Sequence, residues 1–274
     1  MQTIRDPAVA GTFYPGQPDQ LTNNVNELLG AVEAGELVTR PKALVVPHAG
    51  YIYSGPTAAM AYASLAENAA EISRVVLLGP VHRVPVRGLA LPGVDAFATP
   101  LGTIELDSEA ISNIIAMPQI VVSPNAHRLE HSLEVQLPFL QTVLDDFKLV
   151  PLAVGDVSPQ QVAEVLEKLW GGPETLIVIS SDLSHFHSYQ YAQKLDRETV
   201  ESILDLRALT SYEQACGATP VNGLLLAARR HGLKPQLLDM CNSGDTAGDR
   251  QRVVGYAALA FCEPDTFLIE GLEG

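Results

Sequence analysis

Residues 42–55 read KALVVPHAGYIYSG, and the fold prediction starts from this stretch. The run before Pro47 is mostly apolar and ends in the β-branched pair Val45 and Val46, which is typical of a strand buried on both faces. Pro47 cannot donate a ladder hydrogen bond and therefore ends the strand. His48 follows at once, so an imidazole stands where a buried strand leaves its sheet.

The alternation of apolar runs and helical patterns continues along the chain. Further strands are predicted at residues 74–78, 147–154, 175–179, 236–240 and 253–261, and helices at residues 56–66, 132–144, 158–170, 188–209 and 220–230. Prolines and glycines divide residues 88–105 into shorter segments and indicate a small β excursion there. We therefore expect a three-layer αβα fold with a mostly parallel central sheet and helices on both faces, in a single domain spanning residues 1–274.

The composition excludes some classes of function. Hydrophobic residues make up 47% of the 274-residue chain, enough for a large core, and the formal net charge of −15 would repel DNA or RNA. Cys216, Cys241 and Cys262 are too few and too widely spaced for a disulfide framework or a paired zinc motif. We find no signal-peptide pattern and no apolar run of membrane-spanning length, so we expect a cytoplasmic protein without nucleic-acid or membrane partners.

Residues that bind metals or transfer protons follow four of the predicted strands. They are His48, His82, the pair Asp182 and His185, and Cys241. Because the carboxyl ends of parallel strands meet at one edge of a sheet, these loops should converge. A single histidine at a strand end commonly does no more than satisfy its own hydrogen bonds, but three at corresponding positions favour a functional site.

Other candidates have plainer alternatives. A free cysteine is usually a small buried hydrophobe, so Cys216 is interpreted as structural, and only its place at a helix start keeps it a minor candidate thiolate. His127 and His131 would share one helix face, as would Glu130 and Glu134, which suits a site or a solvated helix start equally well. Neither a Walker loop nor a GxGxxG or GxSxG element occurs.

Several segments, in order along the chain, resemble the MEMO family, whose bacterial and archaeal members are also called AmmeMemoRadiSam system protein B. They are RDPAVAGTFYP (5–15), VVPHAGYIYSG (45–55), LLGPVHR (77–83), LEHSLEVQLPFL (129–140), SSDLSHF (180–186) and CGATPVNGLL (216–225). The resemblance covers nearly the whole chain. It implies a fold similar to that of the class III extradiol (non-haem iron) dioxygenases.

The resemblance also implies a metal centre. It assigns the metal to His48, His82 and Cys241, and further site roles to Asp182, His185 and His131. Dioxygenases of this class use a carboxylate where this set has a softer thiolate, so their activity cannot simply be transferred. A divalent or redox metal ion is expected, with iron or copper favoured over zinc.

If the site is catalytic, its residues take distinct roles. His185, oriented by Asp182, would be the general acid or base, and His131 would donate a hydrogen bond to a bound oxygen or oxyanion. Four aromatic residues would line the substrate pocket: Tyr14, Tyr51, Tyr53 and Phe186.

Three functions follow as alternatives. The first is a metal-dependent redox or dioxygenase-like enzyme for a small organic substrate, with radical-SAM and AMMECR1-like proteins as the partners that the resemblance implies. The second is a zinc-type hydrolase with the same site. The third is a non-catalytic protein that handles metal or binds a peptide.

Overall fold

The computed structural model describes residues 2–32 and 40–263. The strands of its large sheet are β2 (Pro41–Val46), β3 (Arg74–Pro80), β4 (Leu89–Leu91), β7 (Ile120–Val122), β8 (Lys148–Val154), β9 (Thr175–Ser180), β10 (His185–His187), β11 (Lys234–Asn242) and β12 (Val253–Cys262). Their order in the nine-stranded sheet is β10-β12-β2-β9-β3-β8-β4-β7, with β11 paired to β12 beside that path.

The centre of this sheet is parallel. β2, β9, β3 and β8 are parallel neighbours, whereas β12 and β4 join them antiparallel on either side. Alternate residues of each central strand enter different cores, as in β2, where Leu44 and Val46 face one core and Ala43 and Val45 the other. A strand buried on both faces explains the continuous apolar runs of the sequence.

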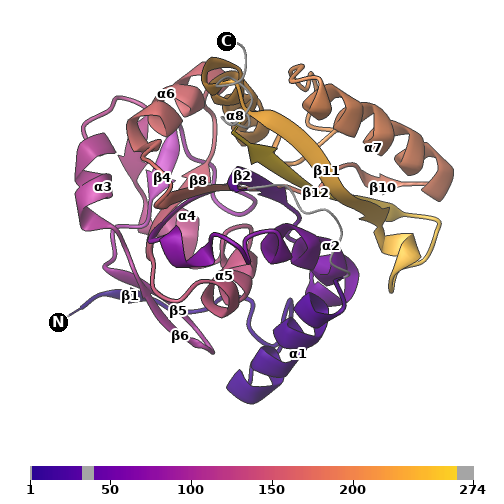
Figure 1. The fold of residues 1–274 in the computed structure, drawn as a ribbon, viewed down its shortest axis with the longest axis horizontal. Helices are drawn as coiled ribbons and strands as arrows, with labels where there is room; N and C mark the ends of the chain where they lie inside the picture. Colours follow the sequence, from indigo (N-terminus) through magenta and orange to yellow (C-terminus); the bar gives the residue numbers. More distant parts are fainter. Residues whose placement is uncertain (1, 33–39, 264–274) are drawn as a thin grey trace, which may run out of the picture.

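Helices cover both faces of the sheet, so the predicted three-layer αβα architecture is confirmed (Figure 1). One face carries α1 (Pro18–Gly30), α2 (Tyr51–Ala63), α4 (Pro124–Arg128) and α5 (Leu137–Val143), with the short 3-10 turns η1 (Ala69–Glu71) and η2 (Glu134–Gln136) in the connections. The other carries α3 (Ser108–Ile114), α6 (Pro159–Leu169), α7 (Tyr189–Leu204) and α8 (Ala218–His231). A third 3-10 turn, η3 (Ser243–Asp245), precedes β12. None of the described helices is long and apolar enough to cross a membrane.

The predicted β excursion is found over residues 96–105, whereas β4 joins the nine-stranded sheet. β5 (Ala96–Thr99) and β6 (Gly102–Glu105) make an antiparallel hairpin, and β1 (Ile4–Arg5) pairs parallel with β5 to form a separate three-stranded sheet. This pairing holds the N-terminal segment, from Ile4 onward, against the β5–β6 hairpin.

Two predicted helices begin several residues away from their predicted starts. α2 begins at Tyr51 rather than at residue 56, because the Tyr51 amide is already satisfied by the Phe13 carbonyl at 2.8 Å and Pro56 is accommodated inside the helix. Residues 132–144 were predicted as one helix, but α5 begins only at Leu137, with Pro138 in its first turn. Proline favours the first turn of a helix, and the residues before it form a loop and η2.

Candidate metal centre

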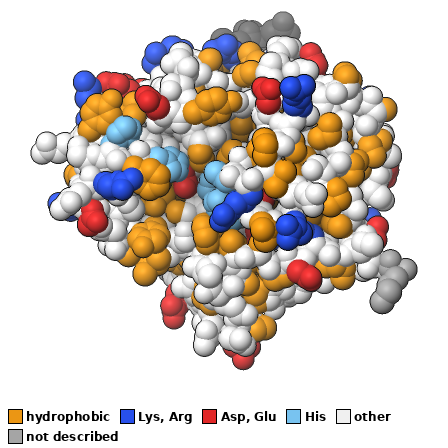
Figure 2. Space-filling view, turned by 180° about the vertical axis from the view of Figure 1, so that it is seen from behind, with side chains coloured by type: hydrophobic (Ala, Val, Ile, Leu, Met, Phe, Trp, Pro, Cys, Tyr) orange, Lys and Arg blue, Asp and Glu red, His pale blue; other side chains and the backbone are white. Residues whose placement is uncertain are grey.

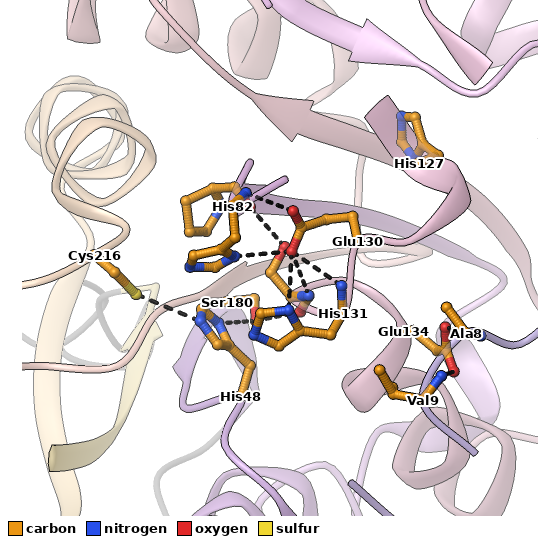
Figure 3. Close-up of polar contacts among 12 residues, drawn as sticks. Ala8, Val9, His48, His82, His127, Glu130, His131, Glu134, Ser180 and Cys216 are labelled. Carbon is orange, nitrogen blue, oxygen red and sulfur yellow. Dashed lines mark hydrogen bonds and ion pairs between the residues drawn. The ribbon is translucent and has the colours of Figure 1, made fainter. Parts of the chain in front are cut away.

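Three histidines from separate segments meet at the carboxyl edge of the sheet (Figure 3). His48 follows β2, His82 follows β3, and His131 lies in the loop before η2. One ring nitrogen of each lies within 4.8 Å of the other two, and the ring centroids are 4.6–5.4 Å apart. Within residues 2–32 and 40–263, no other three His, Cys, Asp or Glu side chains form such a group.

The surroundings of His48 determine which of its nitrogens is free. Its Nδ1 lies 2.9 Å from the Ser180 hydroxyl oxygen, and that hydroxyl donates its only proton to the Ser132 carbonyl at 2.6 Å. The Ser180 oxygen must therefore accept from Nδ1, which carries the ring proton. Nε2 of His48 keeps its lone pair, as a metal ligand requires.

A buried carboxylate orients His82 in the same way. Nδ1 of His82 donates to Oε1 of Glu130 at 2.8 Å, and the His82 amide donates to Oε2 at 2.5 Å. Burial would raise the pKa of Glu130, but the hydrogen bond and the electrostatic attraction of His82, with the backbone hydrogen bonds from Ser132 and His82, outweigh it and lower the pKa to about 2. The ionised carboxylate can only accept, so Nδ1 of His82 carries a proton, and no described residue bonds to Nε2.

His131 shares this carboxylate. Its Nδ1 lies 3.3 Å from Oε1 of Glu130, and its ring packs against Phe13 with the ring centroids 4.8 Å apart. Burial lowers the pKa of His131 to about 4 and that of His48 to about 3, so both rings are neutral at neutral pH. Neutral imidazole is the form that coordinates a metal.

The N-terminal segment anchors the loop that carries His131. Glu134 is fully buried and pairs with the Arg5 guanidinium. It accepts three further hydrogen bonds, from the Ala8 amide (2.8 Å), the Val9 amide (2.9 Å) and the Tyr14 hydroxyl (2.6 Å). Arg5 also donates to the His127 and Glu130 carbonyls at 3.0 and 2.6 Å. Segments 5–15 and 129–140, far apart in sequence, therefore form one structural unit.

Gly79 allows this loop to approach β3. A Cβ atom at position 79 would lie 2.8 Å from Oγ of Ser132, whose hydroxyl donates to the Pro80 carbonyl at 2.8 Å. A larger residue would push the loop away from the strand that ends at His82. The absence of a side chain at this position thus helps to bring two of the histidines together.

The donor set fits a metal ion. Neutral imidazoles suit zinc, copper, iron or nickel, and an acceptor beside each Nδ1 fixes the ring as in known metal sites. Zinc–nitrogen bonds are about 2.0–2.1 Å long, so nitrogens up to 4.8 Å apart would need to move closer together before all three could bind one ion. The three histidines could therefore hold a metal ion, but their chemistry does not select which one.

Cys241, the predicted third ligand, is not part of this group. It lies opposite Tyr256 of β12, and β12 separates β11 from β2. Neighbouring strands are about 4.8 Å apart, so the ends of β11 and β2 are roughly 10 Å apart. The Cys241 thiol instead contacts the Thr57 hydroxyl at 3.1 Å. A residue at a strand end can be assigned to the edge of the sheet, but the sequence does not tell which strands are neighbours along that edge.

A different thiol lies beside the histidines. Sγ of Cys216, just before α8, is 3.4 Å from Nε2 of His48. Burial raises the pKa of Cys216 to about 12, so the group is a thiol in the absence of a metal. The sequence analysis interpreted Cys216 as structural, although its place at the head of the segment CGATPVNGLL was the signal that could have identified it.

Asp182 and His185 do not form the predicted hydrogen-bonded pair. Oδ1 of Asp182 accepts the backbone amide of His48 at 2.7 Å, whereas Nδ1 of His185 donates to the Leu183 carbonyl at 2.9 Å. The path of the chain explains this, because residues 181–184 pass the end of β2 and pair with β12. Asp182 thus supports the backbone of His48, and a carbonyl rather than a carboxylate orients His185.

The predicted pocket tyrosines are placed differently from one another. Tyr14 and Tyr51 are only 3% and 4% exposed, and their hydroxyls donate within the protein core. Tyr53, in the first turn of α2, is 37% exposed. Phe13, which the sequence analysis passed over, contacts His131, while its neighbour Tyr14 bonds to Glu134.

A cavity of about 340 Å³ adjoins the histidines. His82 and Cys216 both line it, together with mainly apolar residues such as Pro80 and Val86 and with the aromatic Tyr212. Figure 2 shows histidine side chains reaching the surface of one face, among hydrophobic and Lys or Arg side chains. The cavity volume of about 340 Å³ is in the range of pockets that bind small organic molecules.

Comparison with known proteins identifies the family. The family model described as Memo-like protein matches residues 5–260. The chain belongs to the Memo family. Proteins named MEMO1 family protein are similar to it throughout: that of Aquifex aeolicus is 39% identical over 272 residues, and that of Archaeoglobus fulgidus is 35% identical over 275 residues. Each alignment covers 94% of this chain and 99% of the relative. The resemblance inferred from the sequence segments is thus confirmed.

Proposed function

We propose that this Memo-family protein is a metal-dependent enzyme that acts on a small organic substrate. The observation that supports the proposal is the convergence of one ring nitrogen each of His48, His82 and His131, next to a cavity that His82 lines. Among the described residues, only the Cys216 thiol bonds to Nε2 of one of these rings, that of His48.

The residues have separable roles in this proposal. A bound metal would supply Lewis-acid or redox chemistry. The three histidines would hold it, and the apolar wall of the cavity would exclude water from the substrate. His185 is the proposed general acid or base, because Leu183 fixes its Nδ1 and no described residue bonds to its Nε2. We keep iron or copper as the metal, and radical-SAM and AMMECR1-like proteins as partners on the family resemblance alone.

The donor set argues against the dioxygenase mechanism itself. Non-haem iron oxygenases commonly hold iron with two histidines and one carboxylate. The group here has a third histidine, and the nearby carboxylates of Glu130 and Asp182 are engaged by protein N–H donors. The same three-histidine set is known in zinc enzymes, so a zinc-type hydrolase is the alternative chemistry for this site.

Cys216 supports a second candidate function, the storage or transfer of a metal. A thiol 3.4 Å from Nε2 of His48 offers a soft ligand, and Cu(I) prefers thiolate and imidazole donors. In a metal carrier the cavity would admit a competing ligand rather than a substrate, and His185 would have no chemical role.

Anaerobic purification, followed by elemental analysis and absorption spectra before and after exposure to air, tests the proposal. Stoichiometric iron or copper with an air-sensitive spectrum supports a redox enzyme or a metal carrier, and rapid transfer of the metal to a chelator distinguishes the carrier. Stoichiometric zinc that is stable in air supports the hydrolase. A folded protein that takes up none of these metals contradicts the proposal.

A further inference from the structure

One buried carboxylate contacts two of the three histidines (Figure 3). Glu130 is 2% exposed. Its Oε1 accepts hydrogen bonds from Nδ1 of His82 at 2.8 Å and from the amides of His131 and Ser132, both at 3.0 Å. Its Oε2 accepts the His82 amide at 2.5 Å, and Nδ1 of His131 lies 3.3 Å from Oε1. A single side chain therefore contacts both the ring and the backbone amide of His82 and of His131.

No Lys or Arg side chain of the described chain pairs with this carboxylate. Arg5 bonds to the Glu130 carbonyl, but its charged contact is with Glu134. Amide and imidazole N–H groups alone solvate the Glu130 charge. A cation held by His82 and His131 would supply the opposite charge that a buried carboxylate otherwise lacks.

We propose that Glu130 is a positioning residue of the metal centre, which sets the tautomer of His82, holds His82 and His131 in one geometry and strengthens metal binding through its negative charge. The proposal rests on the metal-binding function proposed above. Carboxylates that bond to ligating imidazoles commonly fix the ring orientation and increase its basicity. Glu130 thus acts through two imidazoles and not on the ion itself.

The same loop offers a matched control. Glu134 is 0% exposed and also accepts several hydrogen bonds, but its partners are Arg5 and the N-terminal segment. Loss of its charge should lower the stability of the fold without changing the tautomer of His82. Ser180 gives a second comparison, because of the three histidine rings it bonds only to that of His48.

The test measures two quantities in the wild type, Glu130→Gln, Glu134→Gln and Ser180→Ala. The first is the tautomer of His82 in the metal-free protein, from NMR of the ring nitrogens, and the second is the dissociation constant for Zn²⁺ alone, from competition with a chelator. A glutamine at position 130 must turn an NH₂ group toward N–H donors. We therefore expect a mixed His82 tautomer and about 10–100-fold weaker zinc binding in Glu130→Gln.

The controls separate positioning from stability. Glu134→Gln should have a lower melting temperature but the wild-type tautomer of His82, and Ser180→Ala should alter only the His48 ring. A folded Glu130→Gln protein with the wild-type tautomer and wild-type zinc affinity would overturn the proposal.

Two further outcomes remain decisive. If Glu130→Gln does not fold, the metal-free wild type gives the answer: a His82 ring protonated on Nδ1 supports the proposal, and one protonated on Nε2 contradicts it. If the wild type binds no zinc or other metal, the proposed function fails, whereas the His82 tautomer in the variants still decides the role of Glu130.

Discussion

Sγ of Cys216 lies 3.4 Å from Nε2 of His48, although 168 positions of sequence separate the two residues. The contact places a soft donor beside a neutral imidazole at the edge of the three-histidine group. Because burial raises the pKa of Cys216 to about 12, the sulfur keeps its proton until a bound metal ion displaces that proton. Metal ions do this when they bind a cysteine.

The first prediction concerns the two cysteines. In the cobalt-substituted protein we expect a thiolate-to-metal charge-transfer band that is lost in Cys216→Ser. Cys241→Ser should keep the band, because its sulfur contacts Thr57 and not the histidines. Absorption spectra of the two variants at equal cobalt loading check this. A band that disappears only in Cys241→Ser would restore the ligand set predicted from the sequence.

His131 should be needed to retain the metal. We expect His131→Ala to lose stoichiometric metal to the same extent as His48→Ala, because both rings belong to the group of ligand atoms. His187→Ala is the control, since this ring packs on Tyr191 outside the group. Elemental analysis after gel filtration measures the result. Full metal content in His131→Ala would leave this residue only the role of hydrogen-bond donor.

His185 should be dispensable for metal binding. Its Nδ1 bonds to the Leu183 carbonyl and it lies outside the ligand group, so His185→Ala should keep the wild-type metal content. Once a substrate is known, the same variant should lose most of the turnover, since general acid–base catalysis contributes about 10²–10⁴-fold. Release of the metal by His185→Ala would show that this residue is a ligand.

The pair of Arg5 and Glu134 should contribute strongly to stability. Glu134→Gln leaves a buried guanidinium without its counter-charge, which costs about 3–5 kcal/mol of unfolding free energy. Denaturant unfolding checks this. Glu71→Gln is the control, because the pair of Arg40 and Glu71 is 67% and 41% exposed and should contribute less than about 1 kcal/mol. Equal effects of the two substitutions would contradict the structural role of Glu134.

The stability that Asp107 provides should depend on pH. Burial raises the pKa of Asp107, but hydrogen bonds from the Ala110 amide and Arg74 outweigh it and lower the pKa overall. A carboxylate with a lowered folded-state pKa stabilises the fold above its unfolded pKa of about 3.9 and loses this effect as the pH falls. Asp107→Ala also removes the N-cap of α3, so we expect a loss of about 1–2 kcal/mol at neutral pH.

The comparison that tests this prediction is the pH dependence of unfolding. The difference between wild type and Asp107→Ala should become smaller as the pH falls from about 4, where the Asp107 carboxyl of the unfolded chain takes up a proton, through the lower pKa of the folded carboxyl. A difference that stays constant between neutral and acidic pH would mean that the charge of Asp107 contributes nothing and that only the cap matters.

The candidate site was only partly predictable. His48 and His82 could be identified because each directly follows a buried strand and β9 alone lies between those strands. Cys241 lies one residue before the end of β11, but β11 lies beyond β12, and no local pattern reveals strand order. Phe13 was missed in favour of Tyr14 because a coil segment has no fixed periodicity from which the direction of a side chain can be inferred.

The sequence by itself determined the layered α/β architecture, the positions of the central strands and of five helices, and the family, since each depends on local apolar periodicity or on contiguous segments. Only the tertiary structure decided which donors meet. The tertiary structure brought His131 and Cys216 to His48 and turned Asp182 toward a backbone amide. It also gave two carboxylates of one loop different partners, His82 for Glu130 and Arg5 for Glu134. The physical reason is that these contacts depend on strand order and on packing between distant segments, which local residue patterns do not encode.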